Sequence, residues 1–190
     1  MEGKVAIFID GSNLYHALEA NLKRHDLNFT EFSNKLTGTR QLFRTYYYNI
    51  LQNQTQWPET YSEQQDFLDG LRKTPYLEIR LGTTKLAQGV TVEKGVDIML
   101  ATDLLNFTFS NLFDTAILVS GDADFSYVLH AIKNRGIHVE VAYFEKSISK
   151  DLWNIADNRI PLDRAFFKGL WVGKRYPKRR RISKGKGKQE

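Results

Sequence analysis

The sequence predicts an α/β fold in which a mainly parallel sheet is covered by helices on both faces. Unbroken apolar runs typical of buried strands alternate with segments of helical periodicity along most of the chain. Two of the predicted buried strands, residues 5–9 and 115–119, end in a turn that contains an aspartate and leads into a helix. The 190 residues, 42% of them hydrophobic, suffice for one full core and are too few to divide comfortably into two. We therefore expect one domain over residues 1–173 and a tail without fixed structure over 174–190.

The first half of the chain opens with the most regular strand-to-helix unit. Residues 5–9 (VAIFI) are apolar at every position, as in a strand that is buried on both faces. Apolar residues then follow at helical spacing over 14–22, and Ser12 or Asn13 can cap the first turn of this helix. Further along, the pattern predicts a short helix near 31–36, an aromatic-rich strand within 40–51, a polar loop at 52–60 and a helix over 61–73.

The second half repeats the alternation after an irregular stretch. A strand at 77–81 is followed by residues 82–93, where two glycines and alternating Thr and Val indicate an irregular excursion or a small hairpin. The pattern then predicts a helix over 96–106, a buried strand over 115–119, a helix over 125–134 that stops at Gly136, and a strand over 138–144. Folds of this kind bind their ligands at the carboxyl ends of the parallel strands.

The net charge of +5 is distributed unevenly along the chain. Residues 174–190 contain nine Lys or Arg and one Glu, a charge of +8, so the rest of the chain carries −3. Such a tail suits an enzyme that recruits a polyanion through an arm separate from its acidic site, but a tail that only maintains solubility has the same composition. The KRRR run is also compatible with a nuclear-localisation signal. The candidate nucleic-acid contacts are Lys174, Arg175, Lys178, Arg179, Arg180 and Arg181.

Composition argues against several classes of protein. The chain contains no cysteine, so it has neither disulfides nor thiolate metal sites, and we expect a cytoplasmic location. Its amino-terminal apolar run of about five residues is shorter than a signal peptide or a membrane helix requires, so we expect no membrane partner. No G-x-G-x-x-G motif follows the first strand, which argues against a dinucleotide-binding dehydrogenase.

Four aspartates form the candidate catalytic and metal site: Asp10, Asp97, Asp122 and Asp124. Asp10 and Asp122 follow the two buried strands, whose carboxyl ends should bring them together. Asp124 lies two residues further in the same turn, and Asp97 stands near a helix start with Lys94, a candidate supporting residue, three positions before it. Taken singly, Asp10 or Asp122 could instead be a turn or capping residue, and Asp124 could cap the helix that follows it. Asp103 lies on a different helix face from Asp97, so we expect a structural or supporting role for it.

Clustered carboxylates require a compensating charge, because each pair repels by roughly 3 kcal/mol at about 5 Å and an effective dielectric near 20. Mg²⁺ or Mn²⁺ supplies that charge, since both prefer oxygen ligands and both activate water for attack on a phosphodiester. Histidine is not required as a base. The four histidines show no metal-ligand spacing and are expected to be surface or satisfied core residues: His16, His25, His130 and His138.

Three motifs resemble those of the NYN domain family, the LabA-like branch of the PIN-like nucleases. They are FIDGSNLY (8–15), KGVDIMLATDLL (94–105) and LVSGDADFSYVL (118–129), followed by the strand HVEVAYF, and the likeness extends over most of residues 4–165. The resemblance implies a three-layer α/β/α sandwich of Rossmannoid type and Mg²⁺- or Mn²⁺-dependent cleavage of RNA. It implies metal-site roles for the four aspartates and supporting roles for Asn13 and Ser120. The basic tail has no counterpart in the family core.

The predicted function is therefore a metal-dependent ribonuclease, with single-stranded RNA favoured as substrate and a homodimer left open. One alternative is a noncatalytic RNA-binding or regulatory member of the family that keeps the acidic site as a vestige. A less favoured alternative is a phosphatase of the haloacid-dehalogenase type, because SGDADF faintly resembles the metal motif of that family. Such phosphatases need a second aspartate two residues after the first, where this chain has Ser12.

Overall fold

The computed structural model describes residues 3–87 and 90–173, the side chains of 84–94 excepted. Its strands are β1 (Lys4–Asp10), β2 (Gln41–Ile50), β3 (Leu77–Ala87), β4 (Val90–Lys94), β5 (Thr115–Val119), β6 (His138–Tyr143) and β7 (Asn158–Pro161). Its helices are α1 (Gly11–Asn21), α2 (Phe29–Thr37), α3 (Pro58–Arg72), α4 (Val96–Phe109), α5 (Ser126–Lys133) and α6 (Lys150–Ile155), with a 3₁₀ turn η1 (Ala123–Phe125) before α5. None of these helices is long and apolar enough to cross a bilayer.

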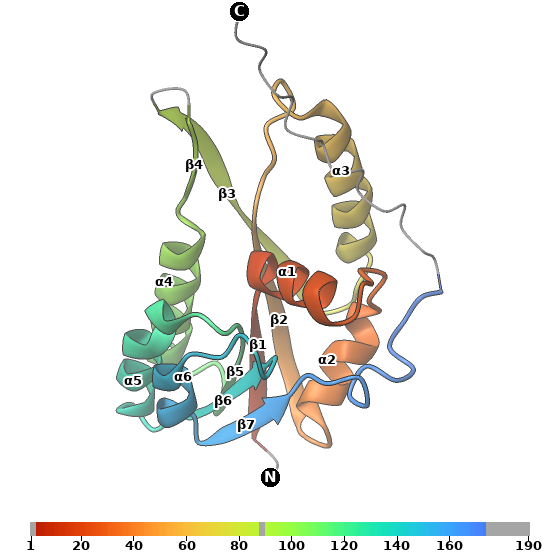
Figure 1. The fold of residues 1–190 in the computed structure, drawn as a ribbon. Helices are drawn as coiled ribbons and strands as arrows, with labels where there is room; N and C mark the ends of the chain where they lie inside the picture. The colour runs from red at the N-terminus through yellow and green to blue at the C-terminus, as the bar shows by residue number, and fades with distance from the viewer. Residues whose placement is uncertain (1–2, 88–89, 174–190) are drawn as a thin grey trace, which may run out of the picture.

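The strands form one sheet in the order β4-β3-β2-β1-β5-β6-β7 (Figure 1). Every neighbouring pair of these described strands is parallel except β3 and β4, which form an antiparallel hairpin. The chain adds β2 and β3 on one side of β1 and then crosses to add β5, β6 and β7 on the other side. The order therefore reverses between β1 and β5, the position at which open α/β sheets bind ligands. The predicted mainly parallel, doubly wound sheet is confirmed.

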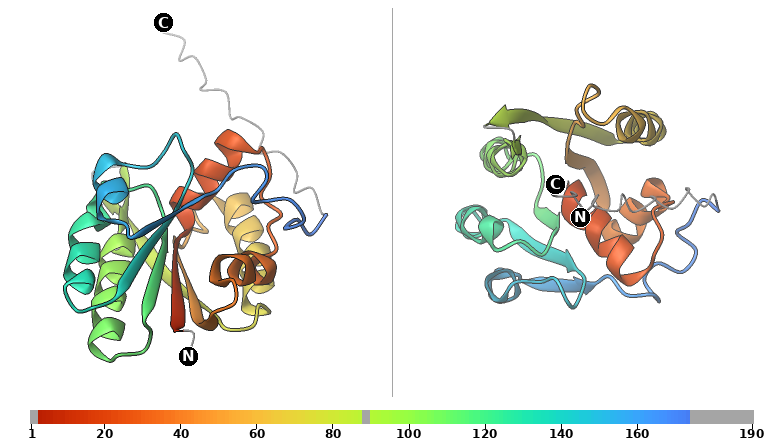
Figure 2. Two further views of the ribbon diagram at one scale, coloured as in Figure 1. Left: turned by 90° about the horizontal axis from the view of Figure 1, so that it is seen from below. Right: turned by 45° about the horizontal axis from the view of Figure 1, so that its top comes forward.

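Helices cover both faces of the sheet, which makes three layers (Figure 2). One core lies under α1, α2 and α3, and the other lies under α4, α5 and α6. β1 serves both cores, because Val5, Ile7 and Ile9 face the first and Ala6 and Phe8 face the second. Complete burial of a side chain the size of phenylalanine contributes about 1.5–3 kcal/mol. The unbroken apolar run that predicted this strand is thus explained by a strand that is buried on both sides.

The structure differs from the sequence expectation mainly in the length and number of short elements. β3 continues well past the predicted strand and forms a hairpin with β4 in the stretch for which a hairpin was one of two expectations. α6 and β7 were not predicted. Six residues are too few to show helical periodicity, and the four-residue β7 ends in Pro161, which a strand pattern disfavours.

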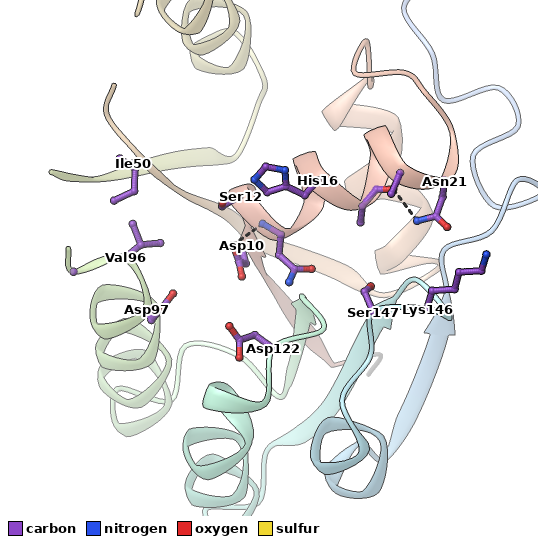
Figure 3. Close-up of a pocket in the computed structure, with 14 residues that line it drawn as sticks. Asp10, Ser12, His16, Asn21, Ile50, Val96, Asp97, Asp122, Lys146 and Ser147 are labelled. Atoms are coloured by element: carbon purple, nitrogen blue, oxygen red, sulfur yellow. Dashed lines mark hydrogen bonds between the residues drawn. The ribbon is translucent and has the colours of Figure 1, made fainter. Parts of the chain in front are cut away.

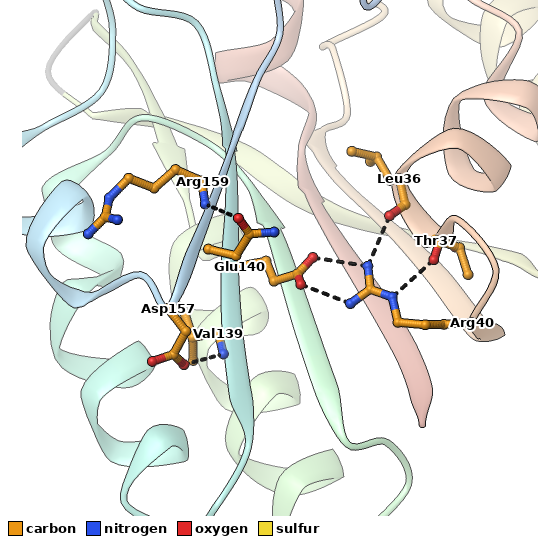
Figure 4. A network of polar contacts seen from close by, with 8 residues as sticks. Leu36, Thr37, Arg40, Val139, Glu140, Asp157 and Arg159 are labelled. Carbon is orange, nitrogen blue, oxygen red and sulfur yellow. Dashed lines mark hydrogen bonds and ion pairs between the residues drawn. The ribbon is translucent and has the colours of Figure 1, made fainter. Parts of the chain in front are cut away.

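A bidentate ion pair joins the end of α2 to β6 across the first core (Figure 4). Arg40 donates from Nη1 to Glu140 Oε1 at 2.8 Å and from Nη2 to Oε2 at 3.0 Å. The same guanidinium donates to the carbonyl oxygens of Leu36 and Thr37, two of the carbonyls that a helix end leaves without partners. Glu140 is only 9% exposed, so Arg40 both neutralises a buried carboxylate and caps α2.

The last described residues are held against the loop that follows α1. The backbone N–H groups of Val172 and Gly173 donate to the carbonyl oxygen and the Oδ2 of Asp26, at 2.9 and 3.1 Å. Asp26 is buried and forms an ion pair with Arg24, whose guanidinium lies 4.5 Å from the ring centroid of Trp171. These contacts fix the position from which residues 174–190 continue.

Candidate functional site

Asp10 is the last residue of β1 and caps the amino terminus of α1. Its Oδ1 accepts a hydrogen bond from the backbone N–H of Asn13 at 3.0 Å, and its Oδ2 accepts one from the hydroxyl of Ser120 at 3.0 Å. The residue is only 6% exposed. Asp10 therefore has the capping role typical of a turn aspartate, and its carboxylate is held in one orientation at the carboxyl end of β1.

The turn after β5 places Asp122 close to Asp10 and carries Asp124 two residues further on. The Ser120 hydroxyl that donates to Asp10 also accepts a hydrogen bond from the backbone N–H of Asp122 at 3.1 Å. Asp122 Oδ1 in turn accepts one from the backbone N–H of Asp124 at 3.0 Å and caps η1. Ser120 thus connects the ends of β1 and β5, the two strands on either side of the point where the strand order reverses.

Asn13 and Gly121 make a second connection between the same two turns. Asn13 Oδ1 accepts a hydrogen bond from the backbone N–H of Gly121 at 3.2 Å. A side-chain carbon at Gly121 would lie 1.9 Å from the carbonyl oxygen of Ser147, which is closer than any real contact, so only glycine fits there. The loop that carries Ser147 therefore rests directly on the turn that carries Asp122.

Asp97 reaches the site from a third element. It lies in the first turn of α4, directly after the β3–β4 hairpin, and its side chain is exposed. Gly95 begins this helix with a φ of +92°, a backbone conformation that favours glycine. The hairpin and this glycine together bring the start of α4 back to the carboxyl edge of the sheet.

Asp10, Asp97 and Asp122 line one cleft with a volume of about 720 Å³ (Figure 3). The other lining residues come from α1, the end of β2, the start of α4 and the loop after β6: Ser12, Asn13, His16, Ala17, Ala20, Asn21, Ile50, Gly95, Val96, Lys146 and Ser147. Asp124 is exposed and does not line the cleft. The side chain of Lys94 and the six candidate nucleic-acid contacts of the tail lie outside the described residues. Three of the four predicted aspartates thus share the cleft, and the fourth adjoins it.

The carboxylates of the site repel one another. Burial raises the pKa of Asp10 above its ordinary value, and the charges of Asp97 and Asp122 add to this effect, whereas the two hydrogen bonds to Asp10 oppose it. Although Asp97 is exposed, partial desolvation by its neighbours raises its pKa, and the charges of Asp122 and Asp124 raise it further. The ion pairs of the described residues all involve other carboxylates, so none of those ion pairs neutralises the site.

The donor set suits a hard divalent cation, because Mg²⁺ and Mn²⁺ prefer carboxylate oxygens. Within residues 3–87 and 90–173, no three acidic or histidine side chains are arranged so that they could hold an ion by themselves. Mg²⁺ does not require such a cage, since it usually keeps several waters and takes one or two carboxylates together with substrate phosphate. The residues therefore fit an ion bound by one or two aspartates of the cleft and otherwise by water or phosphate.

Asp103 stands apart from this site, as expected from its position on α4. Its Oδ2 accepts a hydrogen bond from the hydroxyl of Tyr48 at 2.9 Å and lies 3.5 Å from Nε of Arg80. These contacts fasten α4 to β2 and β3, so the role of Asp103 is structural.

Sequence reasoning did not assign five polar residues of the cleft to the site: Ser12, His16, Asn21, Lys146 and Ser147. His16 is exposed, as predicted for the histidines, but it faces the cleft. His16 and Asn21 continue the side of α1 that begins with Ser12 and Asn13, in steps of four residues. The helical periodicity that starts at the Asp10 cap could therefore have located both. Lys146 belongs to a loop, and no local pattern marks it.

Comparisons with known proteins show the family and the fold of this chain. Residues 4–163 match the NYN domain family, whose members are generally nuclease or RNA-binding domains. The low amplitude and bright protein LabA of Synechococcus elongatus is 27% identical over 172 residues, which cover 84% of each chain. A crystal structure of a protein of unknown function from Vibrio parahaemolyticus shares the fold, with a TM-score of 0.72 and 24% identity over 86% of this chain and 94% of the other. The resemblance found in the three motifs is confirmed, and the chain belongs to the NYN domain family.

Proposed function

We propose that this protein is a metal-dependent ribonuclease whose site is built on Asp10, Asp97 and Asp122, with Asp124 adjoining. The observation that carries the proposal is the convergence of three carboxylates, from β1, α4 and the turn after β5, on one open cleft at the reversal point of the sheet. Isolated capping aspartates have no reason to gather in this way, because their mutual repulsion costs stability. The nuclease and RNA-binding character of NYN domains supports a polyanionic substrate.

The residues of the chain orient the site before any ligand arrives. Ser120 holds one oxygen of Asp10 and the backbone of Asp122, so these two groups keep a constant separation. The second oxygen of Asp10 is held by the start of α1. Asp97 is exposed at the first turn of α4, so its side chain can adjust to the ligand. Carboxylates fixed in the manner of Asp10 bind a charged substrate complex without further reorganisation, which favours catalysis.

A divalent ion bound at these carboxylates would neutralise charge on the scissile phosphate and activate the attacking water. In the proposal, Asp10 and Asp122 bind the ion and Asp97 completes the acidic side of the cleft. Asp124 contributes negative charge from outside the cleft. Asn13 and Ser120 act as positioning residues through the hydrogen bonds described above.

Cleavage of labelled single-stranded RNA, single-stranded DNA and duplex, in Mn²⁺, Mg²⁺ or chelator, tests the proposal. We expect the wild type to cleave RNA only with a divalent ion and Asp122→Asn to lose at least about 100-fold in rate, as expected when a group that stabilises the transition state is removed. Asp66→Asn serves as the matched control, because Asp66 is an exposed carboxylate on α3 outside the cleft. Activity in chelator, or full activity of Asp122→Asn, would refute the proposal.

A second candidate function is noncatalytic RNA binding. It is favoured by the absence, among the described residues, of three side chains that could hold an ion together, and RNA-binding domains occur in the NYN family. Such a protein would bind RNA but would leave the labelled RNA of the cleavage assay intact with Mn²⁺ and with Mg²⁺. The cleavage experiment therefore separates the two functions directly.

A further inference from the structure

The cleft has two chemically different ends (Figure 3). Asp97 lies at one end beside Val96 and Ile50, whereas Lys146 lies at the opposite end on the side of Asn21. Among the described side chains that line this cleft, Lys146 is the only lysine or arginine. The ion pairs formed within the described part of the chain do not include it. Its charge is therefore available to a ligand.

Lys146 is carried by a tight turn that is fixed to the acidic site. The backbone N–H and the hydroxyl of Ser147 both donate to the carbonyl oxygen of Phe144, so Lys146 lies at the tip of this turn. The backbone N–H of Ser149 donates to the carbonyl oxygen of Gly121 at 2.9 Å, and Gly121 has no room for a side chain against the turn. The base of Lys146 thus keeps a constant position relative to Asp122, although its ammonium group is exposed.

The lining of the cleft between its two ends, which we call the floor, is long and has little charge. It is formed by α1, which contributes residues from Ser12 to Asn21, about 14 Å at 1.5 Å per residue. Nucleotides in a stacked strand are spaced by roughly 3.4 Å, so this floor is long enough for more than one. Ala17 and Ala20 have small side chains that leave space above this helix, and His16 adds a polar, aromatic ring.

We propose that the cleft binds a nucleic-acid strand along α1, with one backbone phosphate at the aspartates and another, further along the strand, held by Lys146. This inference rests on the proposed function for the identity of the ligand, and it adds a second phosphate-binding position and a direction for the strand. An ammonium group binds phosphate as a point charge without reading sequence. The acidic end, by contrast, accepts a phosphate only together with a cation. A strand that enters from the Lys146 end therefore gains binding energy before it reaches the carboxylates.

Binding measurements test this role independently of cleavage. The probe is a short, end-labelled single-stranded RNA, and its affinity is measured by fluorescence anisotropy as a function of salt in full-length protein that carries Asp122→Asn. Lys146→Gln is compared with Lys146→Arg, which keeps the charge, and with Lys150→Gln. Lys150 is the matched control, because it is an exposed lysine four residues further along, at the start of α6, and does not line the cleft.

We expect Lys146→Gln to weaken binding by about threefold to tenfold and to lower the slope of log affinity against log salt by about 0.7, the value for one phosphate contact in a single strand. Lys146→Arg should bind like its parent, and Lys150→Gln should change neither quantity. Equal effects of Lys146→Gln and Lys150→Gln, or no effect of either, would overturn the inference. If Lys146→Gln behaves as expected while the wild type cleaves nothing, the nuclease proposal fails and the Lys146 position stands.

Discussion

The ion pair between Arg40 and Glu140 provides a quantitative test of how the first core is held together. Arg40→Met would leave the carboxylate of Glu140 buried without a partner and would remove the donors to two carbonyls at the end of α2. Breaking a fully buried pair costs about 3–5 kcal/mol. The two side chains are 26% and 11% exposed, so water relieves part of this cost. We expect a loss of about 2–4 kcal/mol in the free energy of unfolding.

The double variant Arg40→Met with Glu140→Met should be more stable than Arg40→Met alone. It removes both charges and leaves no unpaired carboxylate, so its cost should fall to about 0–2 kcal/mol, most of it from the lost cap of α2. The difference between the double variant and the sum of the two single variants measures the coupling between the side chains. A coupling of at least about 1.5 kcal/mol is expected.

Urea unfolding followed by circular dichroism in chelator gives these free energies. Arg72→Met is the control, because Arg72 pairs with Asp69 on the surface of α3, where the side chains are 52% and 63% exposed, and its cost should stay below about 1 kcal/mol. The reasoning would be refuted if Arg40→Met cost no more than Arg72→Met, or if the costs of Arg40→Met and Glu140→Met simply added in the double variant.

Four further predictions concern the cleft and the tail. Desolvation and the neighbouring carboxylates raise the pKa of Asp97, so its ionised form destabilises the folded protein. Asp97→Asn should therefore raise the urea midpoint near pH 7. This gain should disappear as the pH falls below 3.8, the ordinary pKa of an aspartate, because the wild-type side chain is then protonated in both the folded and the unfolded state. Gly121→Ala should lower the free energy of unfolding by about 1–3 kcal/mol, because its methyl group would collide with the backbone of Ser147; an unchanged urea midpoint would contradict the close approach. Asp10→Asn should abolish the Mn²⁺-dependent water relaxation that we expect of the wild type, and equal relaxation in both proteins would count against Asp10 as a ligand. Deletion of 174–190 should weaken RNA binding and flatten its salt dependence while cleavage of a saturating short substrate persists; an unchanged salt slope would reduce the tail to a solubility device.

The parts of the fold that the sequence predicted are those determined by local pattern together with one topological rule. Residues 5–9 and 116–119 are apolar at every position because they form neighbouring central strands that are buried on both faces. Each ends in a turn at the carboxyl edge of the sheet, and this rule is sufficient to predict from the sequence that Asp10 and Asp122 are neighbours. Asp97 was assigned to the site because of its apolar surroundings and its place in a motif. The hairpin that brings it to the cleft was one of two expectations for residues 82–93, the other being an irregular excursion.

The rest depends on contacts between segments that are distant in the sequence. Lys146 enters the cleft because its turn packs on Gly121, and neither residue signals this approach locally. Asp124 follows Asp122 by two residues, which suggested that both face one cleft, but η1 turns the chain so that Asp124 lies outside the lining. β7 is recognisable only through its pairing with β6, since four residues carry no periodicity of their own.

The attachment of Gly173 to Asp26 turns the tail into a tether with a defined origin. The seventeen residues that follow can reach no further than roughly 60 Å from that point, whatever conformation they adopt. RNA that these residues bind, as the deletion experiment above tests, would be confined to a small volume around the domain, and its local concentration there would be far above that in free solution. Loosening the attachment, for example with Asp26→Ala, would lengthen the tether without changing a single charge in the tail. If the tail captures RNA as the deletion experiment tests, Asp26→Ala should make encounters between the captured RNA and the cleft less frequent, although Asp26 does not line the cleft.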